Sequence, residues 1–309
     1  MAERAVASHG RETLLQAWVP EFIAAKYPDR ATQARPDGGT RRRFLTAWRT
    51  LRIWLDEMDI TRASQITREQ CRAYPAWRQQ PDKRKGKYRA GRNTALMELK
   101  FLSMVLTEAM ERKQIPANPA LRLGLKPDPR RLRPEFSDEE LKKIVREIKH
   151  EHEPARTMLR NSFLIARWHG VRLNETRVNP MTDVWAQEVG GRKRWMILFR
   201  QKGGREEPKI LHPKLIPLFN KLRTAKATRT YADLPWGNRW HKFLKRIGIS
   251  IASPNACFHS LRITAASRLA RANVAERKAM EYLTHASTTV HASYVRWQPK
   301  DMEECHHAL

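Results

Sequence analysis

A proline-rich segment separates two halves of this chain that differ in their hydrophobic periodicity. The segment GLKPDPRRLRPEF, Gly124 to Phe136, contains three prolines and four basic residues. Proline has no backbone N–H and disfavours helix in the residue before it, so we expect a stiff, extended linker. A chain of 309 residues has room for about two domains. We therefore expect the segment to join two separately folded domains.

A helix is expected immediately after the linker. Ser137 is a favourable N-cap and Glu140 stands three residues later, which is the pattern of a capping box. Phe136 and Leu141 occupy the positions of a hydrophobic staple around that cap. The expected boundaries are a first domain at 1–126, a linker at 127–136 and a second domain at 137–309.

The first half is predicted to be helical, and no strand pattern occurs before residue 180. Apolar residues recur at helical spacing in TRRRFLTAWRTLRIWLDEM and again in NTALMELKFLSMVLTEAMERK. The two prolines of IPANP end the second pattern. The apolar stripes are Leu45, Trp48, Leu51 and Leu55 in the first segment, and Leu99, Leu102, Leu106 and Met110 in the second.

The second half is predicted to contain both strands and helices. Two Gly-Gly pairs, Gly190-Gly191 and Gly203-Gly204, divide DVWAQEVGGRKRWMILFRQKGGREEPKILHP into three short strand-like runs, as in an antiparallel meander. Helical patterns resume in HPKLIPLFNKLR and NRWHKFLKRIG, and again from about Ser260 to the end. The predicted fold class is therefore α-rich, α+β.

The net charge indicates a polyanionic partner. With 60 basic and 32 acidic residues the chain carries +28, and nucleic acid is a better candidate to neutralise it than an anionic membrane. Residues 1–136 hold 28 basic and 15 acidic residues, and 137–309 hold 32 and 17, so both halves should contact the polyanion. No apolar run reaches the ~20 residues of a membrane span, and the first residues contain no apolar signal region.

The most basic stretch is the loop DKRKGKYRAGRN, with six positive charges and no acid between Lys83 and Arg92. Two interpretations stay open: a solvated loop, or contacts to DNA phosphates that fix position without reading base sequence. The candidate DNA-binding residues are Arg41, Arg42, Arg43, Lys83, Arg84, Lys85, Lys87, Arg89, Arg92, Arg130, Arg131 and Arg133.

The cysteines favour a reducing compartment and no metal centre. Cys71, Cys257 and Cys305 are scattered, and they form neither a disulfide framework nor a CxxC site. The terminal run Cys305-His306-His307 is expected to be an exposed tail, because no second ligand cluster completes a tetrahedral site. We expect no metal and no cofactor.

Four stretches of the second half carry residues suited to phosphate chemistry. HGVRLNET contains Arg172, with Glu175 three residues later, and RQKGGRE places Lys202 at the tip of a hairpin. FHSLRITAASRLA places His259 and Arg262 three residues apart, on one face of a helix start. Taken singly, each stretch is a weak signal in a chain with 60 basic residues.

The fourth stretch, LTHASTTVHASYVRW, contains two histidines and a tyrosine. His285 stands nine residues before Tyr294, which in one continuous helix would put them on opposite faces. The β-branched run from Ser287 to Val290 is weak as helix, so we expect the chain to bend there. His291 lies three residues before Tyr294 and would share its face.

In this order and at these spacings, the four stretches resemble the tyrosine recombinase family, which includes phage integrases, Xer-type resolvases and Cre-like enzymes. The family carries Thr-Gly-Leu-Arg-x-Ser-Glu, a hairpin lysine, His-x-Leu-Arg-His-Thr, and Leu-Gly-His with a tyrosine nine residues later. The 23 residues from Arg262 to His285 also fit the Xer-like pattern. The segment from Asn93 to Pro119 resembles the last helix of the family's core-binding domain, so the resemblance covers nearly the whole chain.

The resemblance implies an all-helical, SAM-like core-binding domain and a catalytic domain of helices with a small three-stranded antiparallel sheet. It implies six catalytic residues, Arg172, Lys202, His259, Arg262, His285 and the nucleophile Tyr294, with Glu175 in support. Three residues depart from the family pattern at other positions: His169 for threonine, Ile263 for histidine and Thr284 for glycine.

The resemblance also implies a role for each group. The two arginines hold the oxygens of a DNA phosphodiester and neutralise its charge in the transition state. A phenol with a pKa of about 10 is a poor nucleophile, so His259 or His285 accepts its proton or donates to the phosphate. Lys202 protonates the departing 5′ oxygen. His285 would begin one helix and Tyr294 would lie on the next segment, which leaves His291 as a structural residue or a reserve proton acceptor.

The expected function is site-specific DNA recombination through a 3′-phosphotyrosine intermediate, without metal or ATP, in the integration or excision of a phage or mobile element. The expected partners are double-stranded DNA with inverted half-sites, further copies of the chain in a tetramer on two duplexes, and accessory DNA-bending or directionality factors. Without DNA the chain would be monomeric or weakly associated. We expect a cytoplasmic, DNA-associated protein of bacterial, phage or mobile-element origin, with no membrane partner.

Three alternatives stay open. Xer-type dimer resolution or DNA inversion would use the same chemistry for another purpose. A type IB topoisomerase uses similar residues and rejoins the same strand, but the two-domain layout and the Xer-like spacing favour a recombinase. A DNA-binding regulator without catalysis is least favoured, because all six catalytic positions are filled.

Overall fold

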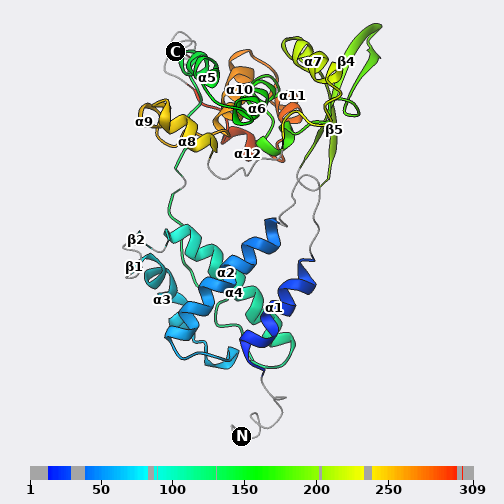
Figure 1. Cartoon of the computed structure of the whole chain (residues 1–309). Coiled ribbons are helices and arrows are strands. Elements are labelled where there is room, and N and C mark those ends of the chain that lie inside the picture. The colour runs from blue at the N-terminus through cyan, green and yellow to red at the C-terminus, as the bar shows by residue number, and fades with distance from the viewer. Residues whose placement is uncertain are drawn as a thin grey trace, which may run out of the picture. The chain divides into compact units, whose positions relative to one another are not determined.

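The structure is a computed structural model that describes residues 13–28, 39–82, 87–88, 90–129, 131–201, 204–232, 239–297 and 301. It forms two compact units, residues 1–130 and 131–309, and each unit has its own hydrophobic core (Figure 1). The division falls inside the segment that the prolines mark in the sequence.

The described part of the first unit is built mainly from α1 (Leu15–Lys26), α2 (Gly39–Glu57), α3 (Arg68–Gln79) and α4 (Arg92–Glu111), with a 3-10 turn, η2 (Ala63–Gln65), before α3. The side chains of Trp54, Tyr74 and Phe101 are fully buried where these helices meet. Burial of such large apolar side chains is the main favourable term in folding this unit. The buried Glu98 carboxylate accepts hydrogen bonds from Tyr74 Oη at 2.7 Å and Arg78 Nε at 2.9 Å, so it is not left unpaired.

The expectation of no strand before residue 180 is wrong. Pro81–Asp82 (β1) and Lys87–Tyr88 (β2) form a two-residue antiparallel pair at the base of the basic loop. Strands this short carry no alternating pattern, so periodicity cannot reveal them. The apolar stripes are mostly buried as expected, but Leu45 is only half-buried and Met110 is 40% exposed.

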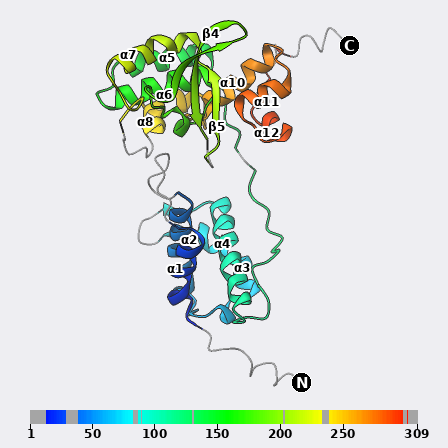
Figure 2. The same ribbon diagram turned by 90° about the vertical axis from the view of Figure 1, so that its right-hand side faces the viewer.

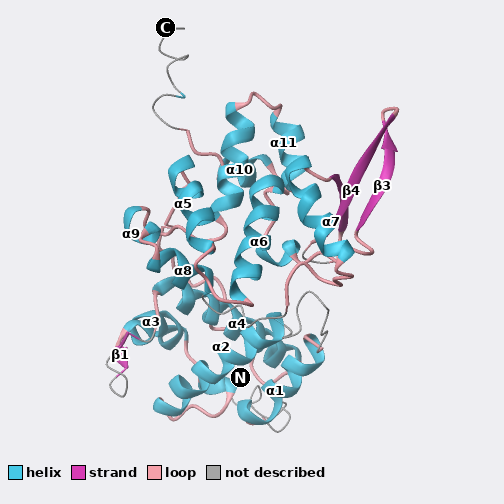
Figure 3. Cartoon of the chain, turned by 45° about the horizontal axis from the view of Figure 1, so that its top comes forward, coloured by secondary structure: helices cyan, strands magenta, loops and turns pink. Residues whose placement is uncertain are grey.

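The second unit contains the predicted antiparallel meander, with the strands in the order β3 (Val184–Val189), β4 (Arg192–Arg200) and β5 (Glu206–Ile210). Gly190 and Gly191 join β3 to β4 with φ values of 58° and 70°, a left-handed conformation that glycine adopts without steric cost. The sheet lies at the edge of the unit, where the β3–β4 hairpin projects beyond the helices (Figure 3).

Helices make up the rest of the second unit and complete the predicted α-rich, α+β class. They are α5 (Asp138–Ile148), α6 (Ala155–His169), α7 (Ile216–Thr224), α8 (Arg239–Arg246), α9 (Ile249–Ala252), α10 (Ser260–Arg271), α11 (Glu276–Leu283) and α12 (Thr288–Ala292), with 3-10 turns η3 (Leu173–Thr176) and η4 (Pro213–Leu215). α10 packs against both α6 and α11, and α12 follows α11 (Figure 2). None of the helices in the described part of the chain has the length and apolar character to cross a membrane.

The proline-rich segment is anchored at both of its ends. The side chain of Asn93, at the start of α4, bonds the backbone of Asp128: its Oδ1 accepts from Asp128 N–H at 2.8 Å and its Nδ2 donates to Asp128 O at 3.1 Å. Phe136 N–H donates to Thr264 Oγ1 on α10 at 2.8 Å. The predicted capping box is present at the start of α5, because Ser137 and Glu140 bond each other's backbone N–H.

The chain bends between α11 and α12, although not at the residues expected. Thr284 takes a left-handed conformation (φ 56°, ψ 48°) and ends α11. The run from Ser287 to Val290 begins α12 instead of breaking a helix, because Ser287 Oγ accepts a hydrogen bond from Val290 N at 3.2 Å. His285 therefore lies in the turn between two helices and does not start one.

Candidate active site

The first element of the site is the turn after α6. Gly170 ends this helix in the left-handed conformation (φ 63°), and Arg172 follows as the residue that precedes η3. Glu175 Oε1 accepts a hydrogen bond from Arg172 Nη1 at 2.7 Å, and Glu175 Oε2 accepts one from the Arg172 backbone N–H at 2.8 Å. The carboxylate is 4% exposed and the guanidinium side chain 39% exposed, so Glu175 orients an arginine that still reaches solvent.

The second element is the start of α10, which carries His259 and Arg262. Arg262 is only 1% exposed, and its donors have defined partners. Nη1 donates to Gly170 O at 2.9 Å, Nη2 donates to Leu283 O, and Nε donates to His285 Nε2 at 3.2 Å. Guanidinium carries five N–H groups, so donors remain for a further partner. Arg262 thus ties the end of α6, the end of α11 and His285 to one point.

Tyr294 lies against these groups. Its hydroxyl is 2.7 Å from His259 Nε2, and its ring centroid is 4.4 Å from that of His285. The guanidinium carbon of Arg262 lies 5.6 Å from the same ring centroid. The bend after α11 therefore brings a tyrosine and a histidine that are nine residues apart into contact.

His291 contacts His285 and not the tyrosine hydroxyl. Their Nδ1 atoms are 2.8 Å apart, and the two residues are 8% and 3% exposed. Because Arg262 donates to His285 Nε2, a neutral His285 carries its proton on Nδ1 and donates it to His291. Both nitrogens of His285 are then occupied, which leaves His259 as the imidazole with a nitrogen on the tyrosine hydroxyl.

The electrostatics of the site keep both imidazoles neutral. Burial lowers the pKa of His259 to about 4, helped by the charges of Arg133, Arg262 and Arg172. Burial likewise lowers the pKa of His285 to about 3, with Arg262 as the next cause. The pKa of Arg262 falls to about 10, first through burial and then through Arg172, so it remains charged at pH 7. Neutral His259 has a nitrogen lone pair that can accept a proton, but burial and the neighbouring cations weaken it as a base until an anion offsets their charge.

Lys202 lies outside the described residues, but another lysine, Lys209 on β5, adjoins the site. It is 8% exposed, its Nζ donates to Tyr282 O, and it lies 4.6 Å from the Tyr282 ring centroid. Burial lowers the pKa of Lys209 to about 8. The sequence motifs did not single out Lys209 as a site residue. Its signal is its position two residues before the buried Leu211, where strand alternation calls for an apolar side chain.

The unusual His169 is part of a second polar cluster behind the site. It is fully buried, and its Nδ1 lies 3.0 Å from Tyr282 Oη. Its Nε2 accepts a hydrogen bond from the His212 backbone N–H at 3.3 Å. Burial lowers the pKa of His169 to about 3, so it is neutral and structural in this setting.

The structure describes the side chains of only some of the candidate DNA-binding residues. Arg42, Arg43, Arg131 and Arg133 are exposed, whereas Arg41 is half-buried. Arg92 is also half-buried, and its Nε donates to Lys126 O at 2.8 Å, which gives it an anchoring role. Lys83, Arg84, Lys85, Arg89 and Arg130 lie outside the described residues, as does the Cys305-His306-His307 tail, and Lys87 is described by its backbone alone.

No protein-family model and no curated protein sequence matches this chain. Solved structures do match. A lambda integrase tetramer bound to a Holliday junction aligns with a TM-score of 0.65 and 16% identity, over 95% of this chain and 80% of that chain. The XerH recombinase in a post-cleavage complex with a palindromic difH substrate gives 0.55 and 16%, over 87% and 76%. The Tn1549 transposon integrase with circular intermediate DNA gives 0.56 and 14%, over 94% and 98%.

The chain has the integrase fold. At identities of 14–18% the likeness concerns the fold, and the chemistry has to be argued from the residues of this chain. Within the integrase fold, five of the six residues expected to be catalytic lie together, and the sixth, Lys202, is outside the described residues.

Proposed function

We propose that this protein is a site-specific DNA recombinase that cleaves and rejoins DNA through a 3′-phosphotyrosine at Tyr294. The observation that carries the proposal is the 2.7 Å contact between the Tyr294 hydroxyl and His259 Nε2, beside the buried Arg262. A nucleophile, a base and a buried cation then meet at one point of a strongly basic chain.

The two arginines give the site its preference for a phosphodiester. Arg262 is held by two backbone carbonyls, and Arg172 is held by Glu175, so both guanidinium groups are fixed before a substrate arrives. Fixed donors that face the non-bridging oxygens stabilise the extra negative charge of the pentavalent transition state. One such donor is typically worth 10²–10³ in rate, or about 3–4 kcal/mol.

The proton and the bonds balance in one transfer. The Tyr294 oxygen forms a bond to phosphorus while its proton passes to Nε2 of neutral His259. The bond from phosphorus to the 5′ oxygen breaks, and the leaving oxygen takes a proton from a general acid, for which Lys202 is our candidate. The phosphotyrosine retains the energy of the phosphodiester, so a 5′ hydroxyl can attack it in the reverse sense without ATP.

The biological setting that we favour is integration or excision of a phage or mobile element. By analogy with the integrase tetramer on a Holliday junction, four copies would act on two duplexes with inverted half-sites. Accessory DNA-bending or directionality factors, dimer resolution and DNA inversion are compatible with the same site. A type IB topoisomerase would use the same first step and differ only in which strand it rejoins.

The test is covalent capture on DNA. Duplexes with randomised flanks and a nick, which lets the short cleaved strand diffuse away, are incubated with the protein, and adducts that survive denaturant are isolated. We expect an adduct from the wild-type protein, none from Tyr294→Phe, and a persistent adduct from Tyr282→Phe, the matched control on α11. Sequencing of the trapped DNA then defines the site.

Two results would count against the proposal. An adduct that persists in Tyr294→Phe would exclude this nucleophile. The wild-type protein could also bind DNA specifically and form no adduct, either on the bound sequences alone or when a second half-site is added. That result would favour a DNA-binding regulator without catalysis. Exchange of flanking strands between two labelled duplexes separates a recombinase from a topoisomerase.

A further inference from the structure

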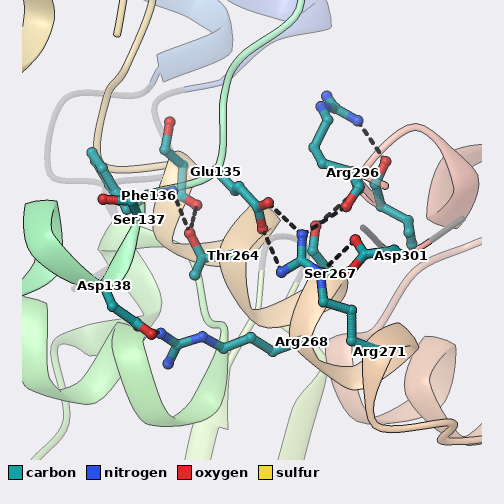
Figure 4. A network of polar contacts seen from close by, with 12 residues as sticks. Glu135, Phe136, Ser137, Asp138, Thr264, Ser267, Arg268, Arg271, Arg296 and Asp301 are labelled. Carbon is teal, nitrogen blue, oxygen red and sulfur yellow. Dashed lines mark hydrogen bonds and ion pairs between the residues drawn. The ribbon is translucent and has the colours of Figure 1, made fainter. Parts of the chain in front are cut away.

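One face of α10 carries a stripe of polar side chains that the proposed chemistry does not use. Thr264, Ser267 and Arg271 stand at positions i, i+3 and i+7, so they line up along the helix (Figure 4). The reacting groups lie at the N-terminal end of the same helix, where His259 is the N-cap residue and Arg262 belongs to the first turn. We call Thr264, Ser267 and Arg271 the α10 stripe.

The stripe binds the end of the proline-rich segment. Thr264 Oγ1 accepts a hydrogen bond from the backbone N–H of Phe136 at 2.8 Å. Arg271 forms a two-pronged ion pair with Glu135, in which Nη1 donates to Oε2 at 3.1 Å and Nη2 donates to Oε1. The two-pronged geometry fixes both the distance and the orientation of the segment.

The same stripe binds the residues that directly follow the tyrosine. The backbone N–H of Arg296 donates to Ser267 Oγ at 2.8 Å, and the backbone carbonyl of Arg296 accepts from Arg271 Nη2 at 2.9 Å. Arg271 Nε donates to Asp301 Oδ2 at 2.8 Å. Arg271 therefore holds both segments at once, as the dashed contacts in Figure 4 show.

The two bound segments also contact each other. Arg296 Nε donates to the backbone carbonyl of Arg133 at 3.2 Å. The side chains of Arg271, Glu135 and Asp301 are 24%, 11% and 10% exposed, so these ion pairs are shielded from solvent more than ordinary surface pairs. The hydrogen bonds to Glu135 raise the pKa of Arg271 above its usual range, so the guanidinium stays charged.

We propose that Arg271 is a positioning residue for Tyr294, and that Glu135 couples this placement to the proline-rich segment. The inference rests on the proposed function. Arg296 is two residues from Tyr294, so fixing its N–H and C=O leaves the tyrosine little freedom to move. Because Arg262 lies in α10 and His259 is its N-cap residue, the nucleophile and its partners are all held by the same helix. Tyr294 consequently attacks the phosphate bound in its own chain.

The first experiment compares two arginines of the same helix. Arg271→Gln removes the clamp, and Arg268→Gln is the matched control, since Arg268 pairs with Asp138 and does not contact the segment after Tyr294. We expect Arg271→Gln to slow adduct formation roughly 10- to 100-fold with unchanged DNA affinity, because small misplacements of a reacting group cost this much. Arg268→Gln should stay within about twofold of wild type on the same scale. Equal rates for the two variants would overturn the inference.

A measurement without DNA keeps this result separate from the proposed function. Hydrogen exchange of the Arg296 amide, which donates to Ser267, should become at least about tenfold faster in Arg271→Gln and not in Arg268→Gln. If wild type forms no adduct, the proposed function fails, and the exchange data still decide whether Arg271 fixes this segment. If Arg271→Gln does not fold, Asp301→Ala removes the carboxylate that accepts from Arg271 Nε, and it should also slow adduct formation and speed the exchange. Wild-type values for that variant would contradict the inference.

A mixing experiment tests delivery within one chain. Tyr294→Phe supplies an intact phosphate pocket, and Arg262→Ala supplies an intact tyrosine beside a defective pocket. The mixture on DNA with two half-sites should give no more adduct than the variants give alone. A mixture that recovers adduct formation would mean that the tyrosine acts on a neighbouring chain, against the inference.

Discussion

The substitution Gly170→Ala should distort the site through its packing contacts, although it changes none of the side chains proposed to react. Gly170 ends α6 with φ 63°, and its carbonyl accepts a hydrogen bond from Arg262 Nη1 at 2.9 Å. A Cβ built at this position would overlap a methyl group of Leu283 and lie 3.0 Å from Ala265 Cβ. Leu283 is fully buried and its carbonyl accepts from Arg262, so a shift of Leu283 that relieves the overlap disturbs packed neighbours and this contact.

The expected cost has two parts. An alanine in the left-handed region costs about 1–2 kcal/mol, less the ~0.4–1 kcal/mol gained from a stiffer unfolded chain. Overpacking a well-filled interior adds about 1–3 kcal/mol. Together we expect a loss of roughly 2–4 kcal/mol in the free energy of unfolding of the second unit.

Urea denaturation of wild type and variants, followed by tryptophan fluorescence and fitted for the transition of the second unit, measures this loss. Gly190→Ala is the matched control, because Gly190 also has a positive φ, 58°, with nothing within 4 Å of the added Cβ. The control retains the backbone cost and lacks the steric part. We therefore expect Gly170→Ala to be less stable than Gly190→Ala by about 1–3 kcal/mol.

Covalent adduct formation provides the second readout. Displacing Leu283 moves the turn that holds His285, so Gly170→Ala should react at least about tenfold more slowly than Gly190→Ala under conditions where both are folded. Equal stability of the two variants, within about 0.5 kcal/mol, would refute the packing argument. If Gly170→Ala shows the expected loss of stability and reacts as fast as Gly190→Ala, the link between Gly170 and the site is refuted.

Two further predictions concern the histidines. His291→Leu leaves the proton on His285 Nδ1 without an acceptor, which should cost about 1–3 kcal/mol of stability and slow adduct formation. His291→Asn keeps an acceptor, so its losses of stability and of reaction rate should be smaller. Equal losses in the two variants would contradict a proton on His285 Nδ1. The second unit should also lose roughly 4 kcal/mol of stability between pH 7.5 and 5.5, about 1.4 kcal/mol for each of His169, His259 and His285. Their folded pKa values of about 3, 4 and 3 keep them neutral, while the unfolded chain gains protons below its pKa of ~6.5. Urea denaturation at the two pH values checks this, and a pH-independent stability would count against it.

Much of the fold could be predicted from the sequence because local signals agreed with it. Gly190-Gly191 marked the first turn of the meander, and Ser137 with Glu140 marked the start of α5. The two-residue pair at 81–88 escaped detection because it has no period. The helix at Thr288 was misjudged because a single capping bond from Ser287 outweighed the weak propensity of the residues after it.

The candidate site could likewise be predicted only in part from the sequence. Motif spacing predicted that Arg172, His259, Arg262 and Tyr294 belong to one site, because their order and spacing can be read directly from the sequence, and the structure places them close together. The contact between His285 and His291 depends on a left-handed Thr284, which composition cannot reveal. Lys209 was missed because a buried lysine resembles an exposed one until its strand face is known.

The end of α11 has a consequence for how binding energy is used. Its last carbonyls, on Tyr282 and Leu283, already accept hydrogen bonds from Lys209 and Arg262. The negative end of a helix thus acts as a built-in counter-anion for two cations that would otherwise repel each other. The free energy needed to bring the two cations together is therefore supplied by folding, and it need not come from the binding of a phosphate to the proposed site. If the protein is the recombinase proposed above, more of the free energy of binding is left to bend and align the DNA.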